Sequence, residues 1–178
     1  MSWARLRSHL RRTASDCSGA AAIEFVLIFP VIFMLNIAAA EALEVYEAQR
    51  NVSHIAAAIA DITAQSHQVS NADLDDIFAA SVSMIHPFPN LAVQQRVSSV
   101  SADSHGTIRV DWTANKAYTG ADDPGVPSGY LAANESAIVT DVVYDYHPQF
   151  GMFLPSTIRF VRHAYVRPRL TAKVEKVS

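Results

Sequence analysis

Hydrophobic residues are distributed unevenly along this chain, and their densest run lies near the amino terminus. Between Ala20 and Ala40 there are 21 residues, and only Glu24 among them is charged. As an α-helix this run measures about 31 Å at about 1.5 Å per residue, close to the ~30 Å of bilayer hydrocarbon. The pattern therefore predicts a transmembrane helix over residues 20–40, with a kink at Pro30, where a backbone donor is lost.

The helical pattern continues beyond the apolar run. Neither glycine nor proline occurs in residues 31–86. Apolar residues also recur at helical spacing, which indicates one buried stripe: Val52, Ile55, Ala56, Ile59 and Ile62. We expect one long helix from about Ala20 to about Gln65, with residues 41–66 extending past the membrane.

A second, shorter helix is predicted within residues 70–86. Ser70 is followed three positions later by Asp73, a pattern typical of a helix amino terminus. Pro87 and Pro89 cannot continue a helix. An amphipathic helix over residues 71–85 is expected, with one apolar stripe: Leu74, Ile77, Phe78, Val82 and Ile85.

From residue 91 the apolar spacing changes toward two, which is typical of β-strands. The clearest example is an alternation of apolar with polar residues, which predicts a half-buried strand: Ile108, Val110, Trp112 and Ala114. Further strands are expected over residues 93–100, 137–146 and 158–166. Consecutive strands without intervening helices favour an antiparallel sheet over residues 91–178, with one face resting on the helices. The expected fold class is α+β: a long transmembrane helix packed against a small antiparallel sheet.

Charge is divided between the two ends of the chain. Residues 1–19 carry a net charge of +3 and the remainder −6, within an overall −3 for 178 residues. Since cytoplasmic flanks of membrane helices are rich in Lys and Arg, residues 1–19 are interpreted as a basic cytoplasmic leader, and everything after residue 40 is placed outside the cytoplasm. The negative balance gives no indication of a nucleic-acid partner.

Three interpretations compete for the apolar segment. A cleaved secretory signal has an apolar core of roughly 7–15 residues and a small-residue cleavage site, which residues 38–40 could imitate. The run is longer than that, however, and Glu24 lies inside its start. A lipoprotein signal requires a cysteine after the apolar run, whereas the single cysteine, Cys17, precedes it. The third interpretation is a permanent anchor.

Glu24 is the unusual residue of this anchor. An ionised carboxylate at the centre of a membrane helix costs about 2.5–3.5 kcal/mol, and less near the interface. Partial hydration among headgroups is one explanation, and a partner charge is the other. If the chain is cut after Gly19, Ala20 carries a free ammonium group, and a neighbouring subunit's amine could reach Glu24 after an axial offset.

The run from Gly19 to Phe25, Gly-Ala-Ala-Ala-Ile-Glu-Phe, lies between basic residues and an apolar helix. It is similar to the class III signals of type IV pilins and pseudopilins. With Pro30 six residues after Glu24, it most closely resembles TadE-like proteins (TadE/TadG family) of tight-adherence (Flp) pilus systems. The resemblance, strong over residues 17–41, implies cleavage between Gly19 and Ala20 by a prepilin peptidase. It also implies that Glu24 and Phe25 serve subunit docking or membrane alignment.

Other motifs separate this chain from its possible relatives. The major Flp pilin is far shorter than 178 residues, and the Asp-x-Ser-x-Ser motif of a von Willebrand-type domain, frequent in TadG-like proteins, does not occur. A minor pseudopilin therefore fits best. Its implied partners are the inner membrane, the prepilin peptidase, other pilins or pseudopilins, and the pilus assembly platform.

The sequence contains none of the common catalytic or metal-binding motifs that we considered. The seven histidines are scattered without a His-Glu-x-x-His pair, and neither a Gly-x-Ser-x-Gly nor a Walker motif occurs. We expect no catalytic residue, metal or cofactor. His147 and His163, on neighbouring strands, could approach each other. Asp122 and Asp123 are interpreted as a solvated turn rather than a calcium loop.

Tyr144 and Tyr146 share one strand face, for which core packing is the first interpretation and an interface the second. The expected function is a non-enzymatic, TadE-like minor pseudopilin in the bacterial inner membrane, crossing it once with a cytoplasmic amino terminus. A singly anchored periplasmic binding or sensor domain is the alternative, and a membrane-tethered hydrolase ranks last. The exact partners, the stoichiometry, methylation of Ala20 and an adhesin role for the sheet domain stay open.

Overall fold

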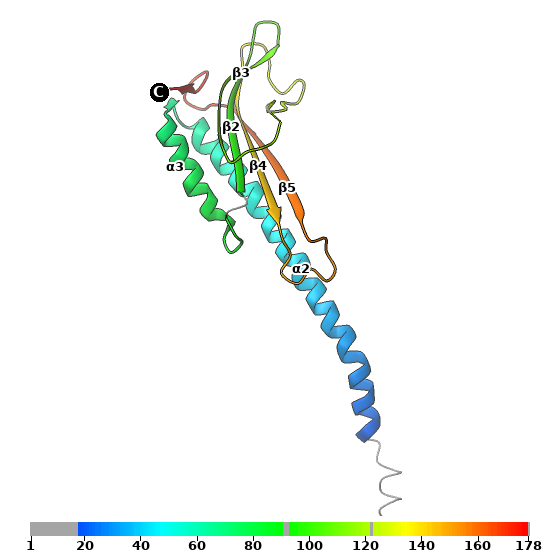
Figure 1. The fold of residues 1–178 in the computed structure, drawn as a ribbon. Helices are drawn as coiled ribbons and strands as arrows, with labels where there is room; N and C mark the ends of the chain where they lie inside the picture. Colours follow the sequence, from blue (N-terminus) through cyan, green and yellow to red (C-terminus); the bar gives the residue numbers. More distant parts are fainter. Residues whose placement is uncertain (1–17, 91–92, 122, 178) are drawn as a thin grey trace, which may run out of the picture. The chain divides into compact units, whose positions relative to one another are not determined.

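The structure is a computed structural model that describes residues 18–90, 93–121 and 123–177 (Figure 1). The chain divides between Ala42 and Leu43 into two compact units. The elements follow in the order α2 (Ser18–Ala64), β1 (Gln68–Val69), α3 (Asn71–Val82), η1 (Ser83–Ile85), β2 (Val93–Ala102), β3 (Ile108–Lys116), β4 (Ser136–Tyr146), β5 (Ile158–Val166) and β6 (Glu175–Lys176). The layout is α+β, as expected.

The first unit consists, in its described part, of the amino-terminal portion of α2. The helix continues through Pro30, which has no N–H to donate to the preceding turn. The Asn36 side chain donates a hydrogen bond from Nδ2 to the Ile32 carbonyl at 2.8 Å, so this amide is satisfied within the helix itself. By length and composition, one helix of the described residues is able to cross a membrane, and it is α2.

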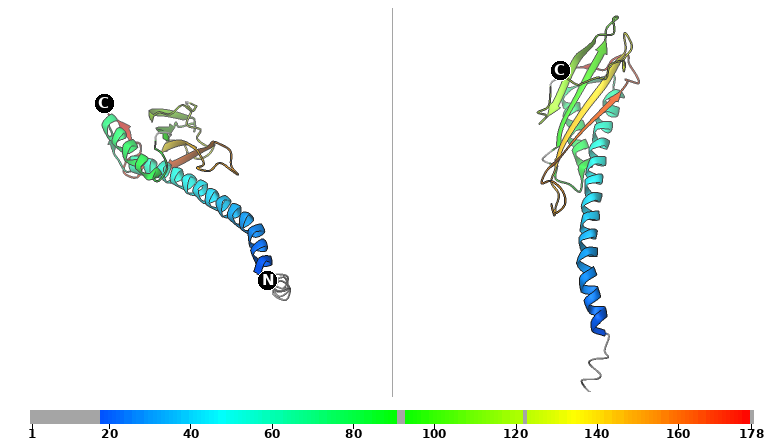
Figure 2. Two further views of the ribbon diagram at one scale, coloured as in Figure 1. Left: turned by 60° about the horizontal axis from the view of Figure 1, so that its bottom comes forward. Right: turned by 90° about the vertical axis from the view of Figure 1, so that its right-hand side faces the viewer.

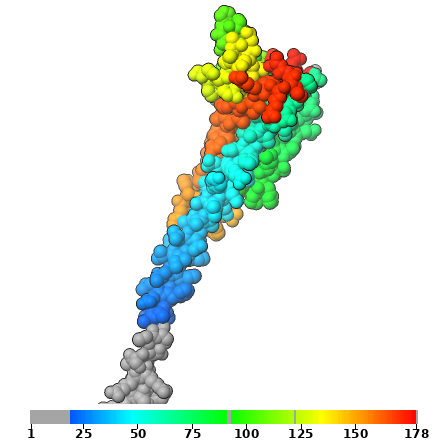
Figure 3. All heavy atoms as spheres, turned by 180° about the vertical axis from the view of Figure 1, so that it is seen from behind, coloured from blue at the N-terminus to red at the C-terminus, as the bar shows by residue number. Residues whose placement is uncertain are grey.

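The second unit is a four-stranded sheet with two helices on one face. The strand order is β3-β2-β4-β5, and every neighbouring pair is antiparallel. The portion of α2 after Leu43 and helix α3 lie on the same side of this sheet (Figure 2), and they lie next to each other when viewed from behind (Figure 3). The main hydrophobic core fills the space between helices and sheet. The predicted antiparallel sheet, with one face on the helices, is confirmed.

The buried stripe of α2 matches the sequence prediction except at its end. Val52, Ile55 and Ile59 are fully buried, but Ile62 is 47% exposed. Each residue of an α-helix turns by about 100° around the axis, so Ile62, ten residues after Val52, points roughly 80° away from the direction of Val52. Thr63 and Ala64 occupy the buried face at this level instead.

Helix α3 begins as its sequence predicts. The Ser70 hydroxyl accepts a hydrogen bond from the Asp73 N–H at 3.2 Å, and the Asp73 carboxylate accepts one from the Ser70 N–H at 2.8 Å. The Ser70 hydroxyl also donates to this carboxylate at 2.7 Å, and the hydrogen bonds that the carboxylate accepts from the N–H and the hydroxyl of Ser70 lower the pKa of the Asp73 carboxyl group. Leu74 and Phe78 are buried in the core. The predicted helix is confirmed, with its last turn formed by the 3₁₀ segment η1.

Strand β3 departs from the simple alternation that its sequence suggests. Trp112 pairs with Ser99, whereas Val110 pairs with Val100, so Asp111 is an extra residue at a β-bulge. Trp112 packs against the main core, but Ile108 packs against a second cluster. The prediction of one shared apolar face was wrong here, because the bulge reverses the side on which the following residues point.

Two short strands, β1 and β6, were not predicted. They form a parallel pair in which Gln68 is opposite Glu175. The Trp112 indole donates a hydrogen bond to the Val174 carbonyl at 2.8 Å, which holds the carboxy-terminal segment against β3. Strands of two residues carry no periodicity that a sequence pattern could reveal.

Candidate functional site

The residues singled out by the sequence lie at the start of α2. Gly19, Ala20, Glu24 and Phe25 are all exposed. A Cβ atom added at Gly19 would meet no atom within 4 Å. Gly19 therefore meets no packing requirement in this fold. The basic leader and Cys17 lie outside the described residues.

Glu24 follows Ala20 by four residues on a continuous helix. Residues with this spacing lie on the same face, one turn apart. The carboxylate and the position of the expected new amino terminus are thus stacked along one side of α2. A second copy shifted by about one turn would place its Ala20 nitrogen beside Glu24.

Aromatic rings line a neighbouring face of the same helix. The ring centroids of Phe25 and Phe29 are 5.4 Å apart, and those of Phe29 and Phe33 are 5.8 Å apart. The large hydrophobic side chains between residues 23 and 35 are all 45–69% exposed, on every face of the helix. A helix that is apolar on all sides is stable in apolar surroundings and not in water. This part of α2 therefore requires lipid or other apolar protein surfaces around it.

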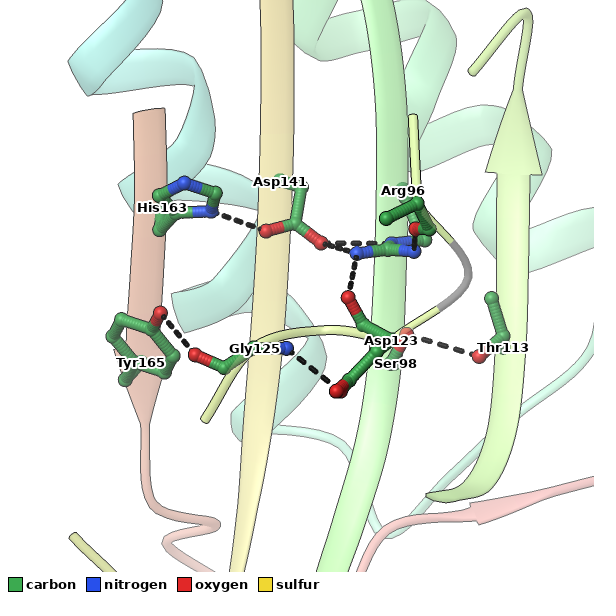
Figure 4. A network of polar contacts seen from close by, with 9 residues as sticks. Arg96, Ser98, Thr113, Asp123, Gly125, Asp141, His163 and Tyr165 are labelled. Carbon is green, nitrogen blue, oxygen red and sulfur yellow. Dashed lines mark hydrogen bonds and ion pairs between the residues drawn. The ribbon is translucent and has the colours of Figure 1, made fainter. Parts of the chain in front are cut away.

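A different constellation, buried and charged, lies in the second unit on the sheet face that points away from the helices (Figure 4). Arg96 of β2 and Asp141 of β4 form an ion pair with 2.5 Å between Nη2 and Oδ2. The other carboxylate oxygen of Asp141 lies 2.5 Å from Nδ1 of His163 on β5. The antiparallel register brings the three together, because Asp141 is directly opposite both Arg96 and His163.

The same network holds the segment that follows β3 against the sheet. Arg96 donates hydrogen bonds to the carbonyls of Ala121 and Asp123, the latter at 3.2 Å. The Tyr118 ring lies over the Arg96 guanidinium, 4.5 Å from its centroid. The Tyr165 hydroxyl donates to the Gly125 carbonyl at 3.2 Å (Figure 4). The Arg96 guanidinium therefore donates to a carboxylate and to two backbone carbonyls. These contacts join β2, β4 and the segment after β3, which are distant in sequence.

His147 and His163 contact different groups of the protein. His163 contacts Asp141, whereas Nδ1 of His147 lies 3.0 Å from the Ser156 carbonyl and 3.1 Å from the Thr157 hydroxyl. Within residues 18–90, 93–121 and 123–177, no group of three or more His, Cys, Asp or Glu side chains is placed to hold a metal ion.

Asp123 lies in a turn, and Tyr144 and Tyr146 lie in the core. The Asp123 carboxylate accepts a hydrogen bond from the Gly125 N–H at 2.9 Å, as in an ordinary Asx turn. Asp122 lies outside the described residues. Tyr144 and Tyr146 are both buried in the main core, which confirms the first interpretation of this pair.

Comparison with protein-family models, with curated proteins and with solved structures finds no match to this chain. The functional assignment therefore depends on the residues of α2 and on their surroundings.

Proposed function

We propose that this chain is a TadE-like minor pseudopilin, a non-enzymatic component of a tight-adherence (Flp type IVb) pilus assembly system. In this proposal α2 anchors the protein once in the bacterial inner membrane, with the amino terminus in the cytoplasm and the second unit in the periplasm. Prepilin peptidase cleaves after Gly19, and α2 then packs with other pilins or pseudopilins on the assembly platform.

The observation that carries the proposal is the surface of α2 between residues 23 and 35. Its large apolar side chains are exposed on every face, and Glu24 is the single charged residue among them. Lipid tails satisfy such a surface before assembly, and the helices of neighbouring subunits satisfy it afterwards. Glu24 is then the one group that requires a specific polar partner, because an unpaired charge in hydrocarbon is costly.

The surroundings of Gly19 also support the proposal. Both Gly19 and Ala20 are exposed, so the bond between them is open to a peptidase. No atom lies near the position of an added Cβ, so packing does not require a glycine here, and the proposal assigns this residue to recognition by the peptidase. After cleavage, Glu24 becomes the fifth residue of the mature chain.

The test is intact mass measurement and amino-terminal sequencing of the membrane-extracted protein, from strains with and without the prepilin peptidase. A chain that begins at Ala20 only when the peptidase is present is the expected result. A start at Met1 in both strains would contradict processing and leave a plain anchor. A start near residue 41 would indicate a secreted protein and contradict the anchor as well.

A further inference from the structure

The loop between β4 and β5, residues 147–157, carries the densest group of exposed apolar side chains in the second unit. Phe150 and Met152 are each 57% exposed, and Phe153 is 48% exposed. The loop contains no Lys, Arg, Asp or Glu. Among the described residues of this unit, the other large hydrophobics that are at least 36% exposed occur singly along the sequence: Leu43, Tyr46, Ile62, Met84, Val110, Val161, Leu170 and Val177.

The two ends of the loop are held together, and the chain turns sharply at its middle. Tyr146 and Ile158 are paired at the ends of β4 and β5, and His147 contacts the Ser156 carbonyl directly beyond them. Gly151, between the exposed residues, has a φ of +60°, a conformation that glycine adopts without steric cost. The loop therefore projects from the sheet as a compact unit of the kind described as an Ω-loop.

Three contacts define the end of the second unit from which this loop emerges. The Tyr146 hydroxyl donates to the Glu44 carboxylate at 3.1 Å, where the second unit begins. Further along, Arg162 donates from Nε to the Ser53 hydroxyl at 3.2 Å, and the Arg169 N–H donates to the Ala64 carbonyl at 3.0 Å. Strand β5 thus runs beside α2 in the same direction, and the loop that precedes β5 lies at the Glu44 end (Figure 1).

The Glu44 end is close to the predicted membrane span along the chain. Glu44 follows Ala40 by four residues. With 3.8 Å between consecutive Cα atoms, the two residues lie within about 15 Å of each other however the helix bends. The tip of the loop is five to six residues from Tyr146, which allows a reach of up to about 17–20 Å. Chain length therefore permits the tip of the loop to come to the level at which the predicted span ends.

We propose that the β4–β5 loop inserts Phe150, Met152 and Phe153 into the interfacial layer of the same bilayer that holds α2. This proposal rests on the proposed membrane anchor. Aromatic side chains favour the interface between headgroups and hydrocarbon, and an uncharged loop enters it without desolvating a charge. The exposed Tyr46, two residues after Glu44, adds an aromatic ring with a polar tip near the same level of the chain. Together with α2, the loop gives the second unit a second attachment point, which fixes its orientation on the membrane.

The test uses the purified full chain in vesicles of phosphatidylethanolamine and phosphatidylglycerol that contain nitroxide-labelled lipid. In a Cys17→Ser background, Met152→Cys is labelled with an environment-sensitive fluorophore. Leu27→Cys reports on the span, and Ser104→Cys is the matched exposed control. Ser104 lies beyond the β2 end that pairs with the start of β4, at the opposite end of the sheet from Tyr146.

The expected result is strong quenching at positions 27 and 152, with several-fold less at position 104. The double change Phe150→Ser and Phe153→Ser should remove most of the quenching at position 152. Quenching at position 27 without quenching at 152 would overturn the loop proposal and leave the anchor intact. No quenching at position 27 would overturn the anchor, and the loop proposal with it. Shielding of position 152 that develops only at high protein-to-lipid ratio would overturn lipid contact in favour of contact between copies.

Discussion

Arg96 and Asp141 form a buried ion pair, with 2.5 Å between Nη2 and Oδ2 and with both side chains almost fully excluded from solvent. They are 45 residues apart in sequence and directly opposite in the register of β2 and β4. The pair lies on the sheet face without helices, where the segment after β3 covers it. A buried pair of this kind contributes less through its own attraction than through the penalty that follows when one partner is lost.

We expect Arg96→Met to lower the free energy of unfolding by about 3–5 kcal/mol, because the Asp141 carboxylate would be left buried without its main partner. Urea denaturation of the full chain in detergent micelles, followed by tryptophan fluorescence, measures this. The double change Arg96→Met and Asp141→Leu should recover most of the loss. Arg159→Met is the control, since its pair with Asp145 is exposed and should contribute only about 0–1 kcal/mol. Equal losses in Arg96→Met and Arg159→Met would contradict the prediction.

Ser70→Ala should destabilise the second unit by about 1 kcal/mol, because the N–H of Asp73 loses its acceptor at the start of α3. Hydrogen exchange of the α3 amides, which reports local opening, is the measurement. Ser83→Ala is a matched control at the carboxy-terminal end of α3. The Ser83 hydroxyl donates to the Ala80 carbonyl at 2.6 Å, but the Ser83 backbone N–H donates to the same carbonyl, so this carbonyl keeps a partner when the hydroxyl is removed. Similar protection in the two variants would argue against a capping role for Ser70.

Acid should weaken the second unit partly through Asp145. Its hydrogen bonds with Arg159, at 2.7 and 2.9 Å, hold the pKa of this carboxyl group below the ordinary 3.8. A lowered folded-state pKa gives stability that is present above the unfolded value and is lost as pH falls through the folded value. As the pH falls below about 4, the urea midpoint of the wild type should therefore decline more than that of Asp145→Asn. Arg159→Gln should flatten the profile in the same way, and parallel profiles for all three proteins would exclude this contribution.

Gly19→Ala should slow trimming while leaving the fold unchanged, because the added methyl group meets no neighbour. Glu24→Ala should permit trimming and impair pilus assembly. Amino-terminal sequencing and pilus counts by electron microscopy distinguish the two defects. Glu47→Ala, at an exposed glutamate of the same helix beyond the apolar run, is the control and should assemble normally. Normal piliation in the Glu24→Ala strain would remove the docking role.

Local periodicity was sufficient to predict most of the secondary structure. The strand expected over residues 158–166 coincides with β5, and the capping pattern of Ser70 and Asp73 placed the start of α3 correctly. Both rest on signals contained within about ten neighbouring residues. The antiparallel order followed from the lack of helices between the strands.

The features that sequence reasoning missed depend on contacts between distant segments. The bulge at Asp111 is visible only when β3 is paired with β2. Arg96 and Asp141 are recognisable as partners only once the register of β2 and β4 is known. The pattern of Gly19 and Glu24 is local in sequence, and its role in processing and docking stays a prediction.

Among the described residues, the sheet ends at β3 on one side and at β5 on the other. A free edge offers unpaired N–H and C=O groups to any second sheet, a particular hazard for proteins concentrated in the plane of a membrane. Both edge strands carry more basic than acidic residues. Strand β3 contains Arg109 and Lys116 with one acidic residue, Asp111, and β5 contains Arg159 and Arg162 with none. Two copies that approach edge to edge would therefore bring like charges together and repel each other. The charge pattern of the sheet's two edges therefore disfavours pairing of one copy's sheet with another's, and leaves the helix as the surface better suited to ordered association.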